Sequence, residues 1–172
     1  MYRIKLLTVL FIFISVIFNP LYSKDKSKPG LMLANIYHQD IDLRDFWVSE
    51  KYDGVRAFWD GEKFLSRAGN IYQAPVWFTE NFPRQKLDGE LWIGRQSFEA
   101  LVSTVRDKAP NDKAWEKVKY MVFDMPEVSE TFDLRLQRLN TLIQRANISW
   151  LHAVEQWRVT DHSELMRNLE HI

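Results

Sequence analysis

The stretch 51–56, which reads Lys-Tyr-Asp-Gly-Val-Arg, constrains the fold of this chain more than any other segment. The flanking stretches 46–50 and 55–59 are rich in valine and aromatic residues, so both predict strands. Asp60-Gly61 then predicts a two-residue hairpin turn into a further strand over 63–67. The core is therefore expected to begin with successive strands, the first two joined by a loop that carries Lys51.

Lysine, aspartate, glycine and arginine at these offsets are typical of the way covalent nucleotidyltransferases present a nucleophile. An amine attacks a nucleoside triphosphate only after it loses its proton, so we expect Lys51 in a partly buried site, among other cations that lower its pKa. Gly54 allows a sharp turn and a close approach to a ligand, and Arg56 offers a planar fork of donors for phosphate or ribose oxygens. Taken alone, the six residues are equally consistent with a charged hairpin arm.

Three further motifs follow: Leu-Ser-Arg-Ala-Gly-Asn at 65–70, Leu-Asp-Gly-Glu-Leu at 87–91 and Tyr-Met-Val-Phe-Asp at 120–124. In this order they resemble the nucleotide-pocket motifs of ATP-dependent DNA ligases, from about residue 31 onward. The small ligases that Gram-negative bacteria export to the periplasm resemble the chain most. The resemblance implies an α+β nucleotidyltransferase (adenylation) domain of the ATP-grasp-like DNA ligase type, with mixed antiparallel sheets and flanking helices.

The resemblance also implies roles for single residues. Lys51 matches the lysine that ATP adenylylates, Glu90 matches a carboxylate that contacts the ribose, and Phe123 matches the aromatic ring that stacks on the purine. A carboxylate suits the ribose because it accepts hydrogen bonds from hydroxyl groups. Without the resemblance, Glu90 would be read as a solvent-facing strand residue and Phe123 as a core residue.

Other charged residues near the motifs complete the expected site. Arg56 matches an arginine that contacts the nucleotide, Arg67 matches one that binds the phosphate of the nicked strand, and Glu50 is a further nucleotide-binding candidate. Asp53 and Asp88 each precede a glycine, so they are either turn or bulge residues or supports behind the site. The four histidines show no metal-ligand spacing, and we expect no dedicated metal site.

The chemistry that the resemblance implies is nick sealing in double-stranded DNA, with ATP and Mg²⁺ as cofactors. Lys51 would take AMP from ATP, AMP would pass to the 5′-phosphate at the nick, and the 3′-hydroxyl would displace it. Such reactions depend mainly on positioning and electrostatics. The implied setting is DNA repair, recombination and replication, and the protein is expected to be a monomer.

Residues that favour turns or break helices, together with the periodicity of apolar residues, predict the remaining elements. Strands are expected over 86–93, 119–125 and 153–160, and helices over 76–82, 98–107, 115–118, 134–146 and from 163 to the C-terminus. In the 134–146 helix, Leu134, Leu136, Leu139, Leu142 and Ile143 are expected to face inward. Ser97 and Ser163 are expected to cap the helices that follow them. Helices and strands in this mixed order indicate an α+β domain.

The N-terminus has the pattern of a secretory signal peptide over residues 1–23. Arg3 and Lys5 precede an apolar run over 6–18, Asn19-Pro20 breaks it, and Ser23 offers a small residue for cleavage. The alternative is an uncleaved membrane anchor, but the run is shorter than the roughly 20 residues that span a bilayer. We expect a periplasmic protein, with no stable membrane association after cleavage and one domain over 24–172.

Composition is compatible with this location and limits how the chain could bind DNA. There is no cysteine, so the chain needs no reducing compartment. Loss of Arg3 and Lys5 would take the basic residues from 23 to 21 against 23 acidic ones, a net charge of −2. A chain with this net charge binds a polyanion poorly, so any contact with DNA must come from a local basic patch.

The sequence also departs from the ligase pattern. The family places a Glu-Gly pair, further lysines and an OB-fold barrel after the segment matched here, and no lysine follows Lys119. We therefore expect an incomplete adenylation domain without the OB-fold, and a sheet that ends on an unpaired edge. Two alternatives stay open: an inactive nucleotide-binding remnant, and a related RNA ligase or capping-type nucleotidyltransferase.

Overall fold

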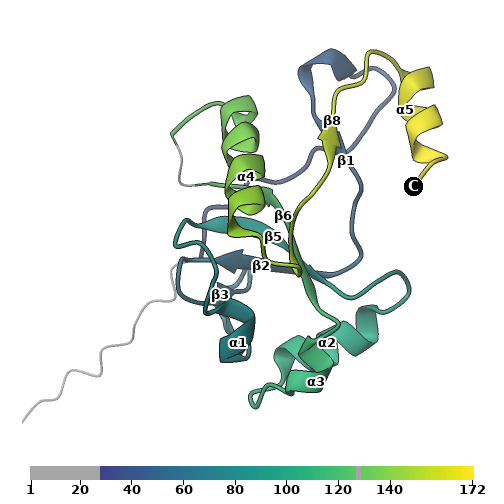
Figure 1. Ribbon diagram of the computed structural model, residues 1–172. Helices are drawn as coiled ribbons and strands as arrows, with labels where there is room; N and C mark the ends of the chain where they lie inside the picture. The colour runs from purple at the N-terminus through teal and green to yellow at the C-terminus, as the bar shows by residue number, and fades with distance from the viewer. Residues whose placement is uncertain (1–27, 127–128) are drawn as a thin grey trace, which may run out of the picture.

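Two β-sheets organise the part of the chain that the computed structural model describes, residues 28–126 and 129–172 (Figure 1). The signal peptide expected over 1–23 lies outside these residues. The larger sheet has six strands in the order β4-β3-β2-β5-β6-β7. Its strands are β2 (Val55–Trp59), β3 (Phe64–Leu65), β4 (Ile71–Tyr72), β5 (Leu87–Trp92), β6 (Lys119–Asp124) and β7 (Leu151–Ala153). All pairs are antiparallel except β6–β7, which is parallel, so the sheet is mixed.

The smaller sheet pairs β1 (Val48–Ser49) with β8 (Gln156–Trp157), two strands more than 100 residues apart in the chain. Five α-helices and one 3-10 helix complete the described residues. They are η1 (Leu43–Asp45), α1 (Val76–Thr79), α2 (Phe98–Arg106), α3 (Asp112–Trp115), α4 (Phe132–Ala146) and α5 (His162–Leu169). Figure 1 places α2 and α3 at one end of the large sheet, and α4, α5 and the small sheet towards the other. This mixed architecture confirms the α+β class.

The core lies on one face of the large sheet. Every second residue of the central strands points into it, as pleating requires; these are Val55, Ala57, Trp59, Leu87, Leu91, Tyr120 and Val122. Helix residues Phe78, Leu101, Val105, Trp115 and Leu139 cover them and are at most 1% exposed. The buried Tyr120 hydroxyl lies 2.9 Å from the carbonyl oxygens of both Ala57 and Leu87, so it ties β2 to β5. The opposite face of these strands carries Arg56, Asp88 and Glu90 beside the apolar side chains of Phe58, Met121 and Phe123.

The structure corrects several expected elements. The strand expected over 153–160 is broken into β7 and β8, which belong to different sheets. The strand expected over 46–50 shrinks to two residues, which pair with β8. Leu134 is 47% exposed, because the inward stripe of α4 runs through Leu136, Leu139 and Ile143. Asp161, not Ser163, caps α5, since its side chain accepts from the Glu164 N–H.

Helix ends near α2 and α3 also differ from expectation. Ser97 occupies the N-cap position of α2 but makes no capping hydrogen bond; its hydroxyl donates to the Arg95 carbonyl. The helix expected over 115–118 begins earlier, at Asp112, because the Asn111 side chain accepts from the Ala114 N–H and caps it there. The lysine loop, by contrast, falls where it was expected. It joins the small sheet to the large one.

Candidate active site

The loop that carries Lys51 runs from the end of β1 to the start of β2, so Lys51 lies on the connection between the two sheets. Gly54 brings this loop against β5. A Cβ at Gly54 would lie 2.7 Å from Glu90 Cγ and would also collide with the Leu91 carbonyl oxygen, so only glycine fits. Lys51 itself is exposed, and its positive charge acts on the neighbouring carboxyl of Glu90. The prediction that Lys51 lies in a partly buried site is therefore wrong for this structure.

Glu90 lies on the polar face of the large sheet, opposite Arg56 in the β2–β5 register. Burial, with a smaller contribution from the nearby Asp88, raises the pKa of its carboxyl to about 7. The Gly54 N–H, which hydrogen-bonds to the carboxyl, and the charges of Lys51 and Arg56 oppose this rise. Glu90 therefore changes its protonation state near neutral pH, beside the candidate nucleophile.

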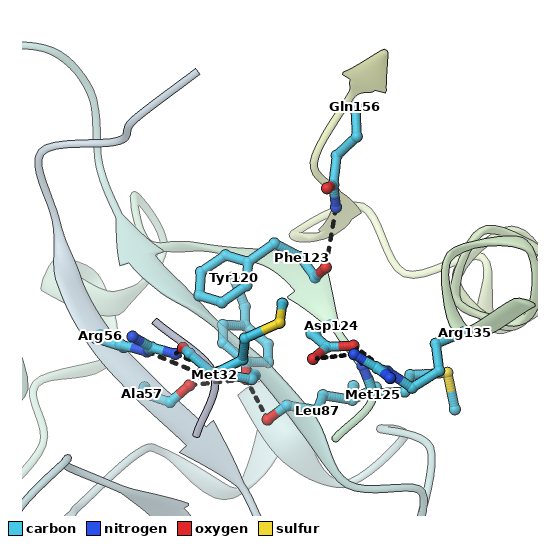
Figure 2. Close-up of polar contacts among 11 residues, drawn as sticks. Met32, Arg56, Ala57, Leu87, Tyr120, Phe123, Asp124, Met125, Arg135 and Gln156 are labelled. Atoms are coloured by element: carbon cyan, nitrogen blue, oxygen red, sulfur yellow. Dashed lines mark hydrogen bonds and ion pairs between the residues drawn. The ribbon is translucent and has the colours of Figure 1, made fainter. Parts of the chain in front are cut away.

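Arg56 is held by Asp88 in a two-point ion pair. Its Nε donates to Asp88 Oδ1 at 3.1 Å and its Nη2 to Asp88 Oδ2 at 2.6 Å. Nη2 also donates to the Met32 carbonyl at 2.7 Å, as Figure 2 shows. Asp88 is 1% exposed, and burial raises the pKa of its carboxyl although Arg56 opposes the shift. The two-point geometry fixes the plane and direction of the guanidinium.

Of the two roles that the sequence left open for Asp88, the structure shows the supporting one. The β5–β6 register shifts between Asp88 and Gly89, which pair with Asp124 and Val122, so Phe123 of β6 is the extra residue of a bulge. A Cβ at Gly89 would lie 2.5 Å from the Met121 carbonyl oxygen and 2.7 Å from the Tyr120 ring, so glycine is required there too. Asp88 supports Arg56 from behind the site through its two hydrogen bonds.

Phe123 contributes an aromatic ring to the same face from β6. The ring is partly exposed, and the Arg56 guanidinium carbon lies 5.3 Å from its centroid (Figure 2). The Phe123 carbonyl accepts from Gln156 Nε2 at 2.9 Å, which ties this strand to the small sheet. Phe123 is therefore not a core residue: it belongs to the surface that Arg56 and Glu90 share.

Asp124 and Arg135 form a second buried ion pair next to this surface, which sequence reasoning missed. Arg135 Nε donates to Asp124 Oδ1 at 2.7 Å and its Nη2 to Asp124 Oδ2 at 3.1 Å, while Nη1 bonds the Glu130 carbonyl at 2.9 Å. An aspartate at a strand end and an arginine in the first turn of the next helix were the available signal. The pair joins β6 to α4.

The structure does not bring every expected residue to this surface. Glu50 forms an ion pair with Arg95 at 2.6 Å. Arg67 is exposed in the turn between β3 and β4, away from β5 and β6 in the strand order. Asp53 is exposed beside Lys51 on the loop. The residues that do meet are Arg56, Asp88, Glu90 and Phe123, with Lys51 next to Glu90.

Residues 28–126 and 129–172 show neither a cluster of metal-binding side chains nor a helix that spans a membrane. No group of three or more His, Cys, Asp or Glu side chains there could hold a metal ion. None of the helices in these ranges has the length and apolar character needed to cross a bilayer.

Known proteins that resemble this chain in sequence and in structure are DNA ligases. The chain is 33% identical over 142 residues to a DNA ligase of Haemophilus influenzae, a match that covers 83% of this chain and 52% of that protein. A structure from a structure–function study of DNA binding by Lig E DNA ligases superposes with a TM-score of 0.75 at 42% identity, covering 83% of this chain and 57% of the other. No protein-family model matches the chain.

A more distant structure shows the same fold. The adenylated DNA ligase of Chlorella virus superposes with a TM-score of 0.57 at 21% identity, over 70% of this chain and 46% of the other. The chain is thus homologous to DNA ligases and has the fold of their ATP-dependent adenylation domains. It spans about half the length of these relatives, and no OB-fold barrel lies among the residues described.

Proposed function

We propose that this chain is the nucleotide-binding part of an ATP-dependent DNA ligase and that Lys51 carries the AMP. The observation that carries the proposal is the grouping of Arg56, Glu90 and Phe123 from three adjacent strands on one sheet face, with Lys51 beside Glu90. Homology to DNA ligases favours this chemistry over other uses of a reactive lysine.

In the first step, Lys51 Nζ attacks the α-phosphorus of ATP. A P–N bond forms, the bond to the bridging oxygen breaks, and its electron pair leaves with pyrophosphate, while the amine proton passes to solvent. Mg²⁺ would arrive with the triphosphate and neutralise its charge. The exposed position of Lys51 lets its amine reach a nucleotide that lies across β2, β5 and β6.

The neighbours of Lys51 would position the nucleotide. Ionised Glu90 would accept hydrogen bonds from the ribose hydroxyls, and the Phe123 ring would stack on the purine. Arg56 would bind the nucleotide through Nη1, because Nε and Nη2 are already bonded to Asp88 and Met32. Glu50 would contact the nucleotide only after it releases Arg95. Arg67 would contact DNA only if the DNA reaches the β3–β4 turn.

The later steps belong to the whole protein. AMP would pass to the 5′-phosphate of nicked double-stranded DNA, and the 3′-hydroxyl would then displace it. Roles in DNA repair, recombination and replication, and a monomeric state, are proposed on the same basis. Because the chain spans about half of its relatives, these steps are tested separately from the first one.

Self-labelling tests the first step. The purified chain is incubated with Mg²⁺ and ATP labelled on the α- or γ-phosphate, beside Lys51→Ala and the control Lys63→Ala, another lysine in a loop next to β2. We expect an acid-labile label from α-labelled ATP on the wild type and the control, and none on Lys51→Ala. Label from GTP alone would instead indicate a capping-type enzyme. No label on folded wild type would indicate a remnant without lysine chemistry.

We also propose export to the periplasm through residues 1–23. The support is the sequence pattern alone, with Arg3 and Lys5 before an apolar run. Expression in a Gram-negative host, followed by fractionation and N-terminal sequencing, tests this. A mature N-terminus at Lys24 in the periplasmic fraction is expected, and an intact Met1 in the cytoplasm would contradict it.

A further inference from the structure

The lysine loop is held on both sides of Lys51 by one neighbouring segment. Glu50 Oε1 lies 2.6 Å from Arg95 Nη2 in an ion pair. Tyr52 packs edge-on against Trp92, with ring centroids 5.1 Å apart and ring planes at 77°. Trp92 is the last residue of β5, and Arg95 follows it before α2 begins. The residues before and after the candidate nucleophile are thus both supported by the end of one strand.

The loop, residues 50–54, runs antiparallel to this end of β5. Its Gly54 N–H hydrogen-bonds to the Glu90 carboxyl, while Tyr52 and then Glu50 make their contacts successively further along the other segment. Half-buried residues alternate with exposed ones along the loop. The half-buried residues carry the contacts, and the lysine is one of the exposed ones. The backbone is therefore held while the amine stays accessible.

The ion pair and the aromatic contact belong to one group of side chains. Burial, and then the charge of Glu50, raises the pKa of the Tyr52 hydroxyl, while the charge of Arg95 opposes the rise. Both members of the ion pair therefore lie close enough to act on the ring that packs against Trp92. A change at either support is expected to be felt by the other.

The connection that carries Arg95 has an uncommon backbone conformation. Gln96 has a φ of 58°, in the left-handed region that residues with a Cβ rarely adopt. The Ser97 hydroxyl donates to the Arg95 carbonyl at 3.2 Å, and Arg95 Nη2 also donates to the Ile172 carbonyl at 3.0 Å. Backbone and side chain of Arg95 are thus both held in place. Sparsely populated conformations of this kind cluster at functional sites.

We propose that Trp92 and Arg95 are positioning residues, which hold the lysine loop so that Lys51 Nζ meets the α-phosphorus of ATP in line with the leaving pyrophosphate. The inference rests on the proposed function for the reaction, and on the contacts of Glu50 and Tyr52 for the choice of residues. An exposed lysine side chain has many conformations, so a backbone fixed on both sides limits where its amine can go. A displacement of about 1 Å at a reacting group can cost about 100-fold in rate.

Rates of self-labelling by α-labelled ATP, measured over a series of ATP concentrations, test the proposal. Arg95→Gln removes the ion pair. Arg138→Gln is its matched control, because Arg138 pairs with Glu130 at the same 2.6 Å and is 63% exposed, against 61% for Arg95. We expect Arg95→Gln to lower the rate at saturating ATP by about twofold to about fivefold, as suits an exposed ion pair, with the half-saturating ATP concentration unchanged. The control should label at the wild-type rate.

The aromatic contact is tested in the same way. Trp92→Leu removes the ring, and we expect the rate at saturating ATP to fall about tenfold, again at an unchanged half-saturating concentration. Trp92→Phe keeps a ring against Tyr52 and should return the rate to within about twofold of the wild type. The control Trp77→Leu changes another half-buried tryptophan, on α1, and should keep the wild-type rate. A loss of folded protein alone would lower the fraction labelled and not the rate.

Three results would overturn the proposal. Equal rates in the wild type, Trp92→Leu and Arg95→Gln would mean that the two residues do not position the lysine, although the proposed function would stand. A lower half-saturating ATP concentration at an unchanged maximal rate in Arg95→Gln would mean that the freed Glu50 binds the nucleotide instead. No labelling of the folded wild type would remove the reaction and the proposed function together. Circular dichroism checks folding, and Tyr52→Leu, with the same expected fall in rate, replaces a misfolded Trp92→Leu.

Discussion

At the scale of single residues, Asp88 decides how Arg56 can meet a ligand. The two-point pair leaves the guanidinium with one free edge, over the Phe123 ring and beside Glu90. Removing one partner of such a buried pair costs about 3–5 kcal/mol, because the other charge stays buried without compensation. The pair is thus positioned before any nucleotide binds, and Asp88 acts through Arg56 and not on the ligand.

Glu90 gives a prediction about pH. Its pKa is raised from 4.5 to about 7 in the folded chain, chiefly by burial. Between these two values the unfolded chain releases the proton while the folded chain keeps it, so the free energy of unfolding falls as pH rises from about 4.5 to about 7. Glu90→Gln removes this dependence. The difference between wild type and variant should change by up to about 3 kcal/mol over this range, measured by urea denaturation.

Glu80→Gln, at an exposed carboxyl that follows α1, is the matched control for this experiment. Its unfolding free energy should follow the wild-type pH dependence. If Glu90→Gln and the wild type instead give parallel curves from about pH 4 to about pH 8, Glu90 titrates as an ordinary surface carboxyl. Its proposed role beside Lys51 would then lose its electrostatic basis.

At the scale of elements, the lysine loop is anchored through the small sheet. Arg158, which follows β8, donates to the Arg44 carbonyl at 2.8 Å and to Asp133 Oδ1 at 2.9 Å, and it lies over the Trp47 ring at 4.8 Å. Trp47 also donates to Asp133. These contacts join β1 and β8 to the start of α4, and the position of Lys51 follows from them because β1 ends two residues before it.

Arg158→Met tests this anchoring. The variant keeps a long apolar side chain over Trp47 but loses both hydrogen bonds and the charge, so β1 and β8 should open more easily than β5 and β6. Hydrogen exchange should speed up at β1 and β8 by up to about fivefold, a modest change because solvent screens exposed ion pairs. Arg145→Met, on the exposed side of α4, should leave these rates unchanged. Equal acceleration in all strands would contradict a local anchor.

Elements with a strong local pattern were predictable from the sequence. β2 was predicted to the residue, and β5, β6 and α2 within about one residue at each end, because alternation, Asp-Gly turns and prolines mark them. The pairing of β1 with β8 was not, since two-residue strands choose partners through packing across the chain. The sequence also did not predict the Arg56–Asp88 and Asp124–Arg135 pairs, because residues on different elements meet only when the chain packs. Glu90 and Phe123, which the motifs singled out, share one face of the sheet, whereas Glu50 pairs with Arg95.

At the scale of the whole molecule, the chain is neutral, spans about half of its relatives and carries Arg56, Glu90 and Phe123 on one face of one sheet. The fold of the adenylation domain is present with its core formed. Lysine chemistry can therefore be measured on this chain through Lys51, separately from the later steps of ligation.

The most direct test of the account is to locate the nucleotide on the chain. After incubation with ATP and Mg²⁺, the protein is digested under conditions that preserve a phosphoramidate, and the modified peptide is fragmented by mass spectrometry. We expect one AMP on Lys51 and none on Lys63, at the other end of β2, or on the exposed Lys119. AMP on another lysine, or none on a folded chain that binds ATP, would contradict the assignment of Lys51 as the nucleophile.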